Sequence, residues 1–306
     1  GNAITGTFNL TFGGVGNITV ADPIATSTAT LTKDGSGTLI LSGANTYSGG
    51  STIKAGILQG NYTAVSASTS SFGANTGTIT IGNTSGSDSA TLLVGYTGLI
   101  YAQPIVLATG TSGTLTIGNT GTAISTTFSG GVTGTNNLTI NENATSGTIT
   151  FSTNPINNSG SITNTGSGTG TTTISGGVGT NASALVTTIT NNSSSSALLI
   201  QTNPIYVASS GTSLILGTTS GFTVSGGILA TGNLTLRNNA GSNNALQIVI
   251  TQINNTGTIS NTGTGGNVNI AAAIGSNVTG ITENSSGWLT IGGAITPAST
   301  LTLTNN

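Results

Sequence analysis

The chain has 306 residues, of which only 3% are charged, and its formal net charge is −2. So little positive charge excludes an electrostatic surface for nucleic acid or for an anionic membrane, and we expect neither as a partner. His, Cys and Met are absent, which excludes imidazole pH switches, thiol chemistry and soft-metal ligands. No apolar run approaches the ~18 residues of a membrane-spanning helix, so we expect no membrane insertion by this chain.

The first 24 residues alternate in the manner of a β-strand. Phe8, Leu10 and Phe12 fall on one side of the alternation, and Gly13-Gly14 ends it. The strand carries no Lys or other charge that would protect an exposed edge. We therefore expect this end of the fold to be uncapped.

Residues 35–60 hold three short apolar strands separated by turns rich in Gly, Ser and Asn. The strands are Thr38–Leu41, Ser51–Ile53 and Ile57–Leu58, and no part of the segment has helical periodicity. A unit of about 25 residues cannot bury its own apolar face and must stack on copies of itself. The segment therefore predicts one coil of a solenoid.

Residues 61–76 interrupt this pattern. They are rich in Ser, Thr and Ala, and we expect a loop or an insertion that leaves one corner of the coil. Strand residues resume at Thr78–Ile81.

Three leucines show the period of the chain most clearly. Leu92, Leu115 and Leu138 lie in matching four-residue strands at a constant interval of about 23 residues. Three sides of about five residues, joined by three turns, account for a coil of this length. We therefore predict coils of about 23 residues, with these leucines in one interior column.

Two sets of markers recur at every second coil in the second half of the chain. One set is Asn143, Asn192, Asn239 and Asn284, and the other is the small-residue runs 129–131, 175–177, 225–227 and 271–273. We expect each set to occupy one corner. The asparagine side chains are expected to pair from coil to coil, and the glycines to supply the positive φ of the turns.

Residues 35–60 closely resemble the passenger-associated repeat of bacterial autotransporter proteins. The resemblance rests on Gly37–Gly43, Asn45–Gly50, Thr52-Ile53, Ala55-Gly56 and Leu58. It implies a right-handed parallel β-helix that is displayed outside the cell. Because the resemblance covers only this segment, two alternatives stay open: the chain is a fragment of a passenger, or the repeat is used in another protein.

These patterns predict an all-β chain, a right-handed parallel β-helix of about 12–13 coils that forms a single rod over residues 1–306. Coils about 4.8 Å apart make this rod on the order of 60 Å long. Leu301–Asn306 begin another coil with no helix, charge or proline to stop it, so we expect both ends to be uncapped. Uncapped ends predict end-to-end association of the chain with copies of itself, or continuation by further repeats of the same chain.

The charged residues do not form a catalytic pattern. Polysaccharide-degrading β-helices need clustered carboxylates with a base or a cation. The acids here are Asp22, Asp34, Asp88, Glu142 and Glu283, and the bases are Lys33, Lys54 and Arg237. Glu142 and Glu283 align with Asn191 and Asn238 of the intervening units, and this interchange predicts a solvated turn position. A calcium-binding repeat needs Asp in every turn, whereas Asp88 is isolated. We predict no catalytic, cofactor-binding or metal-binding residues, and no cofactor.

Two surface features permit binding without indicating it. Asn-x-Ser/Thr sequons occur about as often as the high Ser and Thr content gives by chance, so they permit glycosylation only. The aromatic residues Tyr47, Tyr62, Tyr96, Tyr101, Tyr206 and Trp288 fall at non-equivalent positions. This placement favours the filling of corners and interior gaps over a sugar-stacking surface.

The sequence thus favours a non-enzymatic extracellular or cell-surface rod, either an adhesin stalk or the subunit of a filament. One alternative is a monomeric module that binds a glycan or another cell through the loop at 61–74 or through a face of Thr and Asn. A polysaccharide-degrading enzyme is the less favoured alternative.

Overall fold

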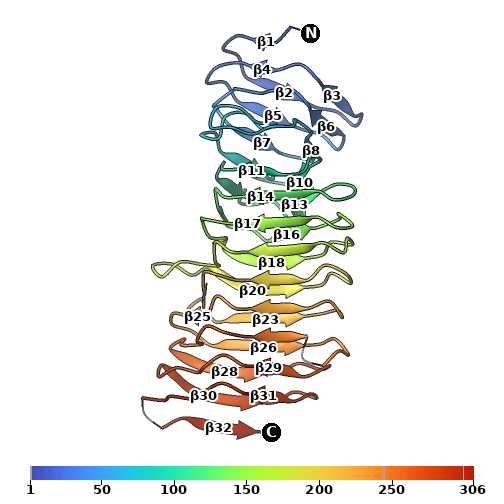
Figure 1. Ribbon diagram of the computed structural model, residues 1–306. Coiled ribbons are helices and arrows are strands. Elements are labelled where there is room, and N and C mark those ends of the chain that lie inside the picture. The colour runs from blue at the N-terminus through green and yellow to red at the C-terminus, as the bar shows by residue number, and fades with distance from the viewer. Residues whose placement is uncertain (1, 244, 299) are drawn as a thin grey trace.

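The computed structural model describes residues 2–243, 245–298 and 300–306. Within these ranges the chain is all-β and contains no helix. Its parallel sheets stack as a β-solenoid of about 13 turns, with equivalent positions roughly 23 residues apart. Figure 1 shows the elongated body, with the N-terminal strands at one end and β32 (Thr302–Asn305) at the other. The predicted solenoid and its number of coils are confirmed.

Two long sheets form two sides of the coil. Sheet I has 13 strands: β3 (Ile18–Val20), β6 (Thr38–Leu41), β8 (Gly56–Gly60), β10 (Ala90–Val94), β13 (Leu115–Asn119), β16 (Leu138–Asn141), β18 (Gly160–Asn164), β20 (Val186–Asn191), β23 (Thr212–Leu216), β26 (Leu234–Asn238), β28 (Gly257–Asn261), β30 (Val278–Glu283) and β32. Sheet II has 9 strands: β11 (Leu99–Tyr101), β14 (Ser125–Phe128), β17 (Thr148–Phe151), β19 (Thr171–Ile174), β21 (Leu198–Ile200), β24 (Phe222–Val224), β27 (Leu246–Ile248), β29 (Val268–Ile270) and β31 (Leu289–Ile291).

The third side of the coil is less regular. Sheet III has 6 strands: β2 (Leu10–Phe12), β5 (Leu31–Lys33), β7 (Ser51–Ile53), β9 (Ile79–Ile81), β12 (Ile105–Leu107) and β15 (Val132–Gly134). Beyond β15 this side continues through parallel bridges at single residues and through the pair β22 (Ile205–Tyr206) and β25 (Ile228–Leu229). At the N-terminal end, β1 (Ile4–Thr5) pairs with β4 (Ile24–Ala25).

The predicted strands of residues 35–60 are confirmed. β6 and β7 have the predicted bounds, and the third strand, β8, extends beyond the predicted Ile57–Leu58 in both directions. β6 pairs with β8 in sheet I, whereas β7 pairs with β5 and β9 in sheet III. The strands of this unit therefore bond to neighbouring coils, as a stacked repeat requires.

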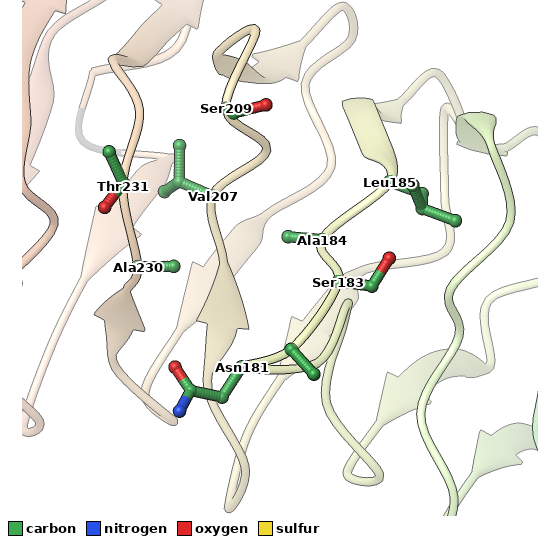
Figure 2. A pocket seen from close by; sticks show the side chains of 9 residues that line it. Asn181, Ser183, Ala184, Leu185, Val207, Ser209, Ala230 and Thr231 are labelled. Carbon is green, nitrogen blue, oxygen red and sulfur yellow. The ribbon is translucent and has the colours of Figure 1, made fainter.

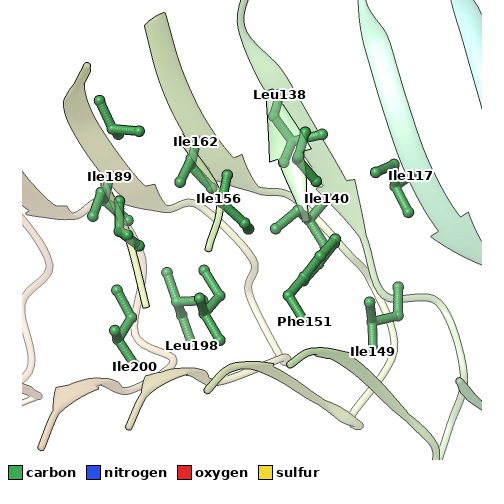
Figure 3. Close-up of a cluster of buried hydrophobic side chains, with 14 of the residues drawn as sticks. Ile117, Leu138, Ile140, Ile149, Phe151, Ile156, Ile162, Ile189, Leu198 and Ile200 are labelled. Atoms are coloured by element: carbon green, nitrogen blue, oxygen red, sulfur yellow. The ribbon is translucent and has the colours of Figure 1, made fainter. Parts of the chain in front are cut away.

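The core consists of columns in which the inward side chains of one coil lie on those of the next. Ile162 pairs with Ile189 in sheet I, and Phe151 pairs with Ile174 in sheet II. Figure 3 shows buried side chains of both sheets gathered in the interior, together with Ile156 of the third side. Burial of each such side chain contributes roughly 1.5–3 kcal/mol.

The predicted leucine column is wrong at Leu92. All three leucines are buried, but Leu92 pairs with Ile117, and Leu115 pairs with Ala90. The physical reason is that the turns differ in length. Residues 108–114 separate β12 from β13, whereas only 135–137 separate β15 from β16. A shift of two residues keeps every side chain on its face of the strand, so the mistaken alignment still placed the leucines in the core.

Residues 61–78 contain no strand, yet part of this segment lies in the core. Ser70 forms an antiparallel bridge with Asn45, and Phe72 is fully buried. The Phe72 ring begins an aromatic column with Tyr101 and Phe128, at centroid distances of 5.0 and 5.8 Å. Phe151 continues the column at 5.6 Å. The segment thus fills the interior where sheet II begins.

Both marker sets occupy the predicted corners. Asn143, Asn192, Asn239 and Asn284 each follow a strand of sheet I, and the small-residue runs each follow a strand of sheet II. Gly131, Gly177 and Gly227 have φ of 80°, 87° and 94°. In the intervening coils, the corner that follows sheet II is one residue longer. A non-glycine residue has a positive φ there: 65° for Thr153, 71° for Thr202 and 70° for Ile250. Alternate coils therefore turn this corner in two different ways.

Candidate functional site

The charged side chains are spread along the solenoid. In the part of the chain that the structure describes, no group of three or more Asp, Glu, His or Cys side chains is placed to hold a metal ion. Lys33 and Glu142 are buried. A buried charge requires hydrogen-bond partners, so the surroundings of these two residues define what they do.

Lys33 closes a corner of the early coils. Its backbone pairs with Phe12 and Ile53 of the adjacent strands, so the side chain starts inside an apolar column. The Nζ atom donates to the carbonyl oxygens of Asp34 at 3.0 Å, Gly35 at 2.6 Å and Ala55 at 3.2 Å. Burial lowers the pKa of Lys33, and the neighbouring carboxylate of Asp34 opposes that shift. The ammonium group thus satisfies main-chain carbonyls at the turn.

Glu142 is fully buried, and the predicted exposure of this residue is wrong. Its Oε1 atom accepts hydrogen bonds from Asn119 Nδ2 at 2.9 Å and from the backbone N–H of Ala144 at 3.1 Å. Burial raises the pKa of Glu142, while these hydrogen bonds act in the opposite direction. The side chain points into the solenoid because it serves the turn that follows β16.

Glu283 repeats this arrangement in the last coils and is half-buried. Asn261 Nδ2 donates to Glu283 Oε2 at 2.9 Å, and the backbone N–H of Ser285 donates to Oε1 at 2.7 Å. The predicted full exposure is therefore wrong here as well. Both carboxylates are used by the chain itself.

The ends of the sheet I strands carry a series of inward polar residues, which we call the inner corner residues: Asn119, Glu142, Asn164, Asn191, Asn238, Asn261 and Glu283. Asn164 Nδ2 donates to Asn191 Oδ1 at 2.9 Å, but the next residue of this column is Leu216. Asn143 and Asn239 instead accept from the backbone N–H of Ser167 and Thr264, so the predicted ladder of asparagine side chains is wrong. Asn191 Oδ1 accepts from the backbone N–H two residues later, as Glu142 does. An amide oxygen and a carboxylate oxygen can both accept this bond. Asn and Glu therefore interchange because of a shared hydrogen bond and not because of solvent.

The aromatic residues divide between core and surface. Tyr47 and Tyr101 are buried; burial raises the pKa of both hydroxyls, that of Tyr101 to about 12. The Tyr47 hydroxyl forms a hydrogen bond with Ser51 Oγ at 2.7 Å. Trp288 is 75% exposed and Tyr96 is 40% exposed, at separate places. Tyr206 is half-buried beside a recess.

Two neighbouring recesses flank the loop 180–185, between the third side and β20. The first has a volume of about 390 Å³ and lies between the loop and the coils that carry Val207 and Ala230 (Figure 2). The second has a volume of about 230 Å³ and is lined by Asn181, Asn203 and Tyr206 together with Thr, Pro and Gly residues. No charged side chain lines either recess. Both surfaces offer neutral hydroxyl and amide groups beside apolar ones.

One comparison with known protein families gives a match. Residues 31–59 match the family model of the passenger-associated-transport-repeat. This segment spans β5 to β8 and agrees with the resemblance found in residues 35–60. No curated protein and no solved structure matches the chain. The segment is thus a passenger-associated repeat within a β-solenoid.

A search for membrane-spanning helices finds none that is long and apolar enough among the described residues.

The sequence alone did not reveal the recesses. Apart from Leu185, the loop 180–185 consists of small and polar residues, as the other turns of the chain do. Tyr206 was noticed only as an isolated aromatic residue. No sequence signal identifies the recess, because the alignment of Gly179 with Tyr206 on adjacent coils follows only from the bridge between Val178 and Ile205 in the structure.

Proposed function

We propose that this chain is a non-enzymatic structural rod of an extracellular or cell-surface protein, a stalk or filament subunit that serves adhesion. The observation that carries the proposal is the passenger-associated repeat at residues 31–59, which forms one part of a continuous solenoid with a closed apolar interior. A stack of this kind gives length and stiffness from repeated short-range contacts.

The arrangement of the carboxylates supports a structural role over catalysis. A glycoside hydrolase needs two carboxyl groups on either side of a substrate, roughly 5–9.5 Å apart. Glu142 is buried, and both Glu142 and Glu283 accept hydrogen bonds from the turns that follow their own strands. Oligosaccharide hydrolysis by the purified protein, abolished by Glu283→Gln, would contradict the proposal.

We further propose that the solenoid associates end to end, with copies of itself or with further coils of its own chain. β32 bonds to β30 on one edge, and Leu303 within β32 is 63% exposed. The first coil passes through β1, β2 and β3, and the last coil passes through β31, Ile295 and β32, so both meet the three sides in the same order. An exposed edge of this kind templates further pairing.

Electron microscopy and surface labelling test the two parts separately. Long fibres of the purified chain would support end-to-end association, and isolated rods of about 60 Å at high concentration would overturn it. Antibody or protease access to the chain on intact source cells tests the surface location. A chain that is protected until the cells are broken would contradict an extracellular role.

A further inference from the structure

The loop 180–185 is a rigid projection. The backbone N–H of Thr180 donates to Ser183 O, and the N–H of Ser183 donates to Thr180 O, each at 3.1 Å. Asn157 of the preceding coil holds the same loop: its Nδ2 donates to Ser183 O at 2.8 Å, and its Oδ1 accepts from the N–H of Leu185 at 3.1 Å. The loop therefore stands away from the solenoid in a fixed position, as the projecting loop before β20 in Figure 1 shows.

Gly179 lies directly beside Tyr206 at the smaller recess. The bridge between Val178 and Ile205 places Gly179 next to Tyr206 on adjacent coils, and the N–H of Tyr206 donates to Val178 O at 2.8 Å. On the following coil Tyr206 pairs with Leu229. A Cβ on Gly179 would lie 3.2 Å from Tyr206 Cβ and 3.3 Å from Ala184 Cα, so glycine lets the coil and the loop approach closely here. Gly179 and Tyr206 both line the 230 Å³ recess.

The alternating corner deepens the same recess. The run Gly176-Gly177 lies between two coils whose corners carry Asn154-Pro155 and Asn203-Pro204. Asn203 Nδ2 donates to Ser175 O at 2.7 Å, which fixes the Asn203 side chain across the glycine coil and leaves its Oδ1 atom as an acceptor. Gly176 lines the recess between Pro155 of one coil and Pro204 of the other.

Several polar groups at this recess are not used by the fold. Neither the Tyr206 hydroxyl nor the Asn181 amide has a hydrogen-bond partner among the described residues. Asn181 extends from the loop toward the neighbouring coils in Figure 2, and it lines both recesses. The inner corner residues, by contrast, are engaged with the turns around them. Unused donors and acceptors beside a partly open aromatic ring are what a ligand site requires.

The chemistry of these groups selects one class of ligand. The absence of charged lining residues disfavours an anionic or cationic partner. A peptide that adds as a strand needs unpaired main-chain groups, whereas Thr180 pairs with Ser183 and β22 pairs with β25. A neutral sugar offers an apolar C–H face for an aromatic ring and hydroxyls that both donate and accept, as amide and hydroxyl side chains do.

We propose that the recess beside Tyr206 binds a neutral hexose unit of a glycan. The sugar ring lies against Tyr206 in this recess, and its hydroxyls bond to Asn181 and to Asn203 Oδ1. The 390 Å³ recess, with Val207, Ala230 and Thr231, receives the next sugar of the glycan on the other side of the loop. This proposal rests on the adhesive role proposed above, because it names the class of ligand to which the rod would adhere.

The test uses the purified chain and a panel of neutral oligosaccharides of glucose, galactose, mannose and N-acetylglucosamine, with heparin and polysialic acid as anionic counterparts. Saturation-transfer NMR and titration measure binding. We expect at least one neutral oligosaccharide to bind, and Tyr206→Ala to weaken its Kd about tenfold or more. Asn181→Ala is expected to weaken binding by a smaller factor.

Matched variants separate the site from the fold. Tyr96→Ala removes another exposed aromatic ring, and Asn192→Ala removes another exposed asparagine at a different corner; both should leave the Kd unchanged. An unchanged melting temperature of Tyr206→Ala shows that the variant is folded, and Tyr206→Phe, which keeps the ring, should retain most of the binding. Binding of only anionic glycans or of unrelated peptides, no binding at all, or full binding by a folded Tyr206→Ala would overturn the proposal. None of these results bears on surface location or filament formation, which are tested on intact cells and by microscopy.

Discussion

The early and middle coils bury the same column of sheet I with different side chains. Leu39, Leu58 and Leu92 pair in succession in the early coils, whereas further along the same column Asn164 pairs with Asn191. Both sets are fully buried. The difference lies at the strand ends, because the asparagines occupy the last position of β18 and β20, where turn amides and carbonyls face inward and need partners.

The solenoid therefore has two interior environments, one along the middle of the strands and one at the inner corner. Along the middle of the strands, the main chain is satisfied by the neighbouring coils, and the side chains need only be apolar. At the inner corner the turn leaves polar groups that the coil stacking does not satisfy. A buried Asn or Glu there supplies partners to the turn, although Leu216 takes the last position of β23 in the same column. The same polar residue in the middle of a strand would be destabilising.

The largest expected loss of stability comes from truncating a buried aromatic side chain in the apolar interior. Phe128 lies between Tyr101 and Phe151 in the aromatic column and is 1% exposed. Phe128→Ala removes these contacts and leaves a cavity, so we expect the free energy of unfolding to fall by about 3–5 kcal/mol. Urea titration measures the change. Phe8→Ala, at a ring that is 53% exposed, is the control and should cost much less; equal losses would contradict the column.

A smaller loss of stability is expected when an inner corner residue is replaced. Asn191→Ala removes two hydrogen bonds that the Asn191 amide donates, to Ser196 O and Gly221 O. It also removes the one that Asn191 Oδ1 accepts from the Ser193 N–H. We expect the free energy of unfolding to fall by about 1–3 kcal/mol, because buried polar groups lose their partners. The adjacent Asn192 is exposed, and Asn192→Ala should stay within about 0.5 kcal/mol. If Asn191→Leu proved as stable as the native chain, the inner corner would be an ordinary apolar site.

Glu142 makes stability depend on pH. Burial raises its pKa in the folded state, so the folded protein binds this proton more tightly than the unfolded chain does. The corresponding stability is present below the ordinary pKa of Glu and is lost as pH rises through the raised folded-state pKa. We expect Glu142→Gln, which keeps an acceptor for Asn119 and Ala144, to flatten this loss between acidic and neutral pH.

Melting temperatures across that pH range measure the effect. Asp88 is an exposed carboxyl group, and Asp88→Asn should leave the slope of the native chain in place. A slope that persists in Glu142→Gln would show that other groups cause it.

The limits of the sequence follow from the same two environments. Alternation and the repeat of residues 35–60 predicted the sheets, because apolar strand residues report burial directly. The exposure predicted for Glu142 was wrong because composition alone does not distinguish a polar residue that faces solvent from one that bonds a turn. The position of Leu92 was wrong because the lengths of turns such as 108–114 vary. The recess beside Tyr206 depends on which residues of adjacent coils are aligned, and small errors in the period conceal that alignment.

The smallest effect concerns the corner after sheet II, where alternate coils differ. Thr202 has a φ of 71° at this corner, whereas Gly177 has 87° in the coil before it. A non-glycine residue in the left-handed region costs roughly 1–2 kcal/mol, and glycine costs roughly 0.5–1 kcal/mol in lost chain freedom on folding. Thr202→Gly should therefore raise the free energy of unfolding slightly, by less than about 1 kcal/mol.

Thr223→Gly, in the middle of β24, is the matched control and should lower the free energy of unfolding, since strand φ gives no strain to relieve. Gly177→Ala should also destabilise, because a Cβ there would lie 2.9 Å from Pro204 O. If Thr202→Gly and Thr223→Gly destabilise equally, the longer corner is unstrained, and the alternation reflects turn length alone.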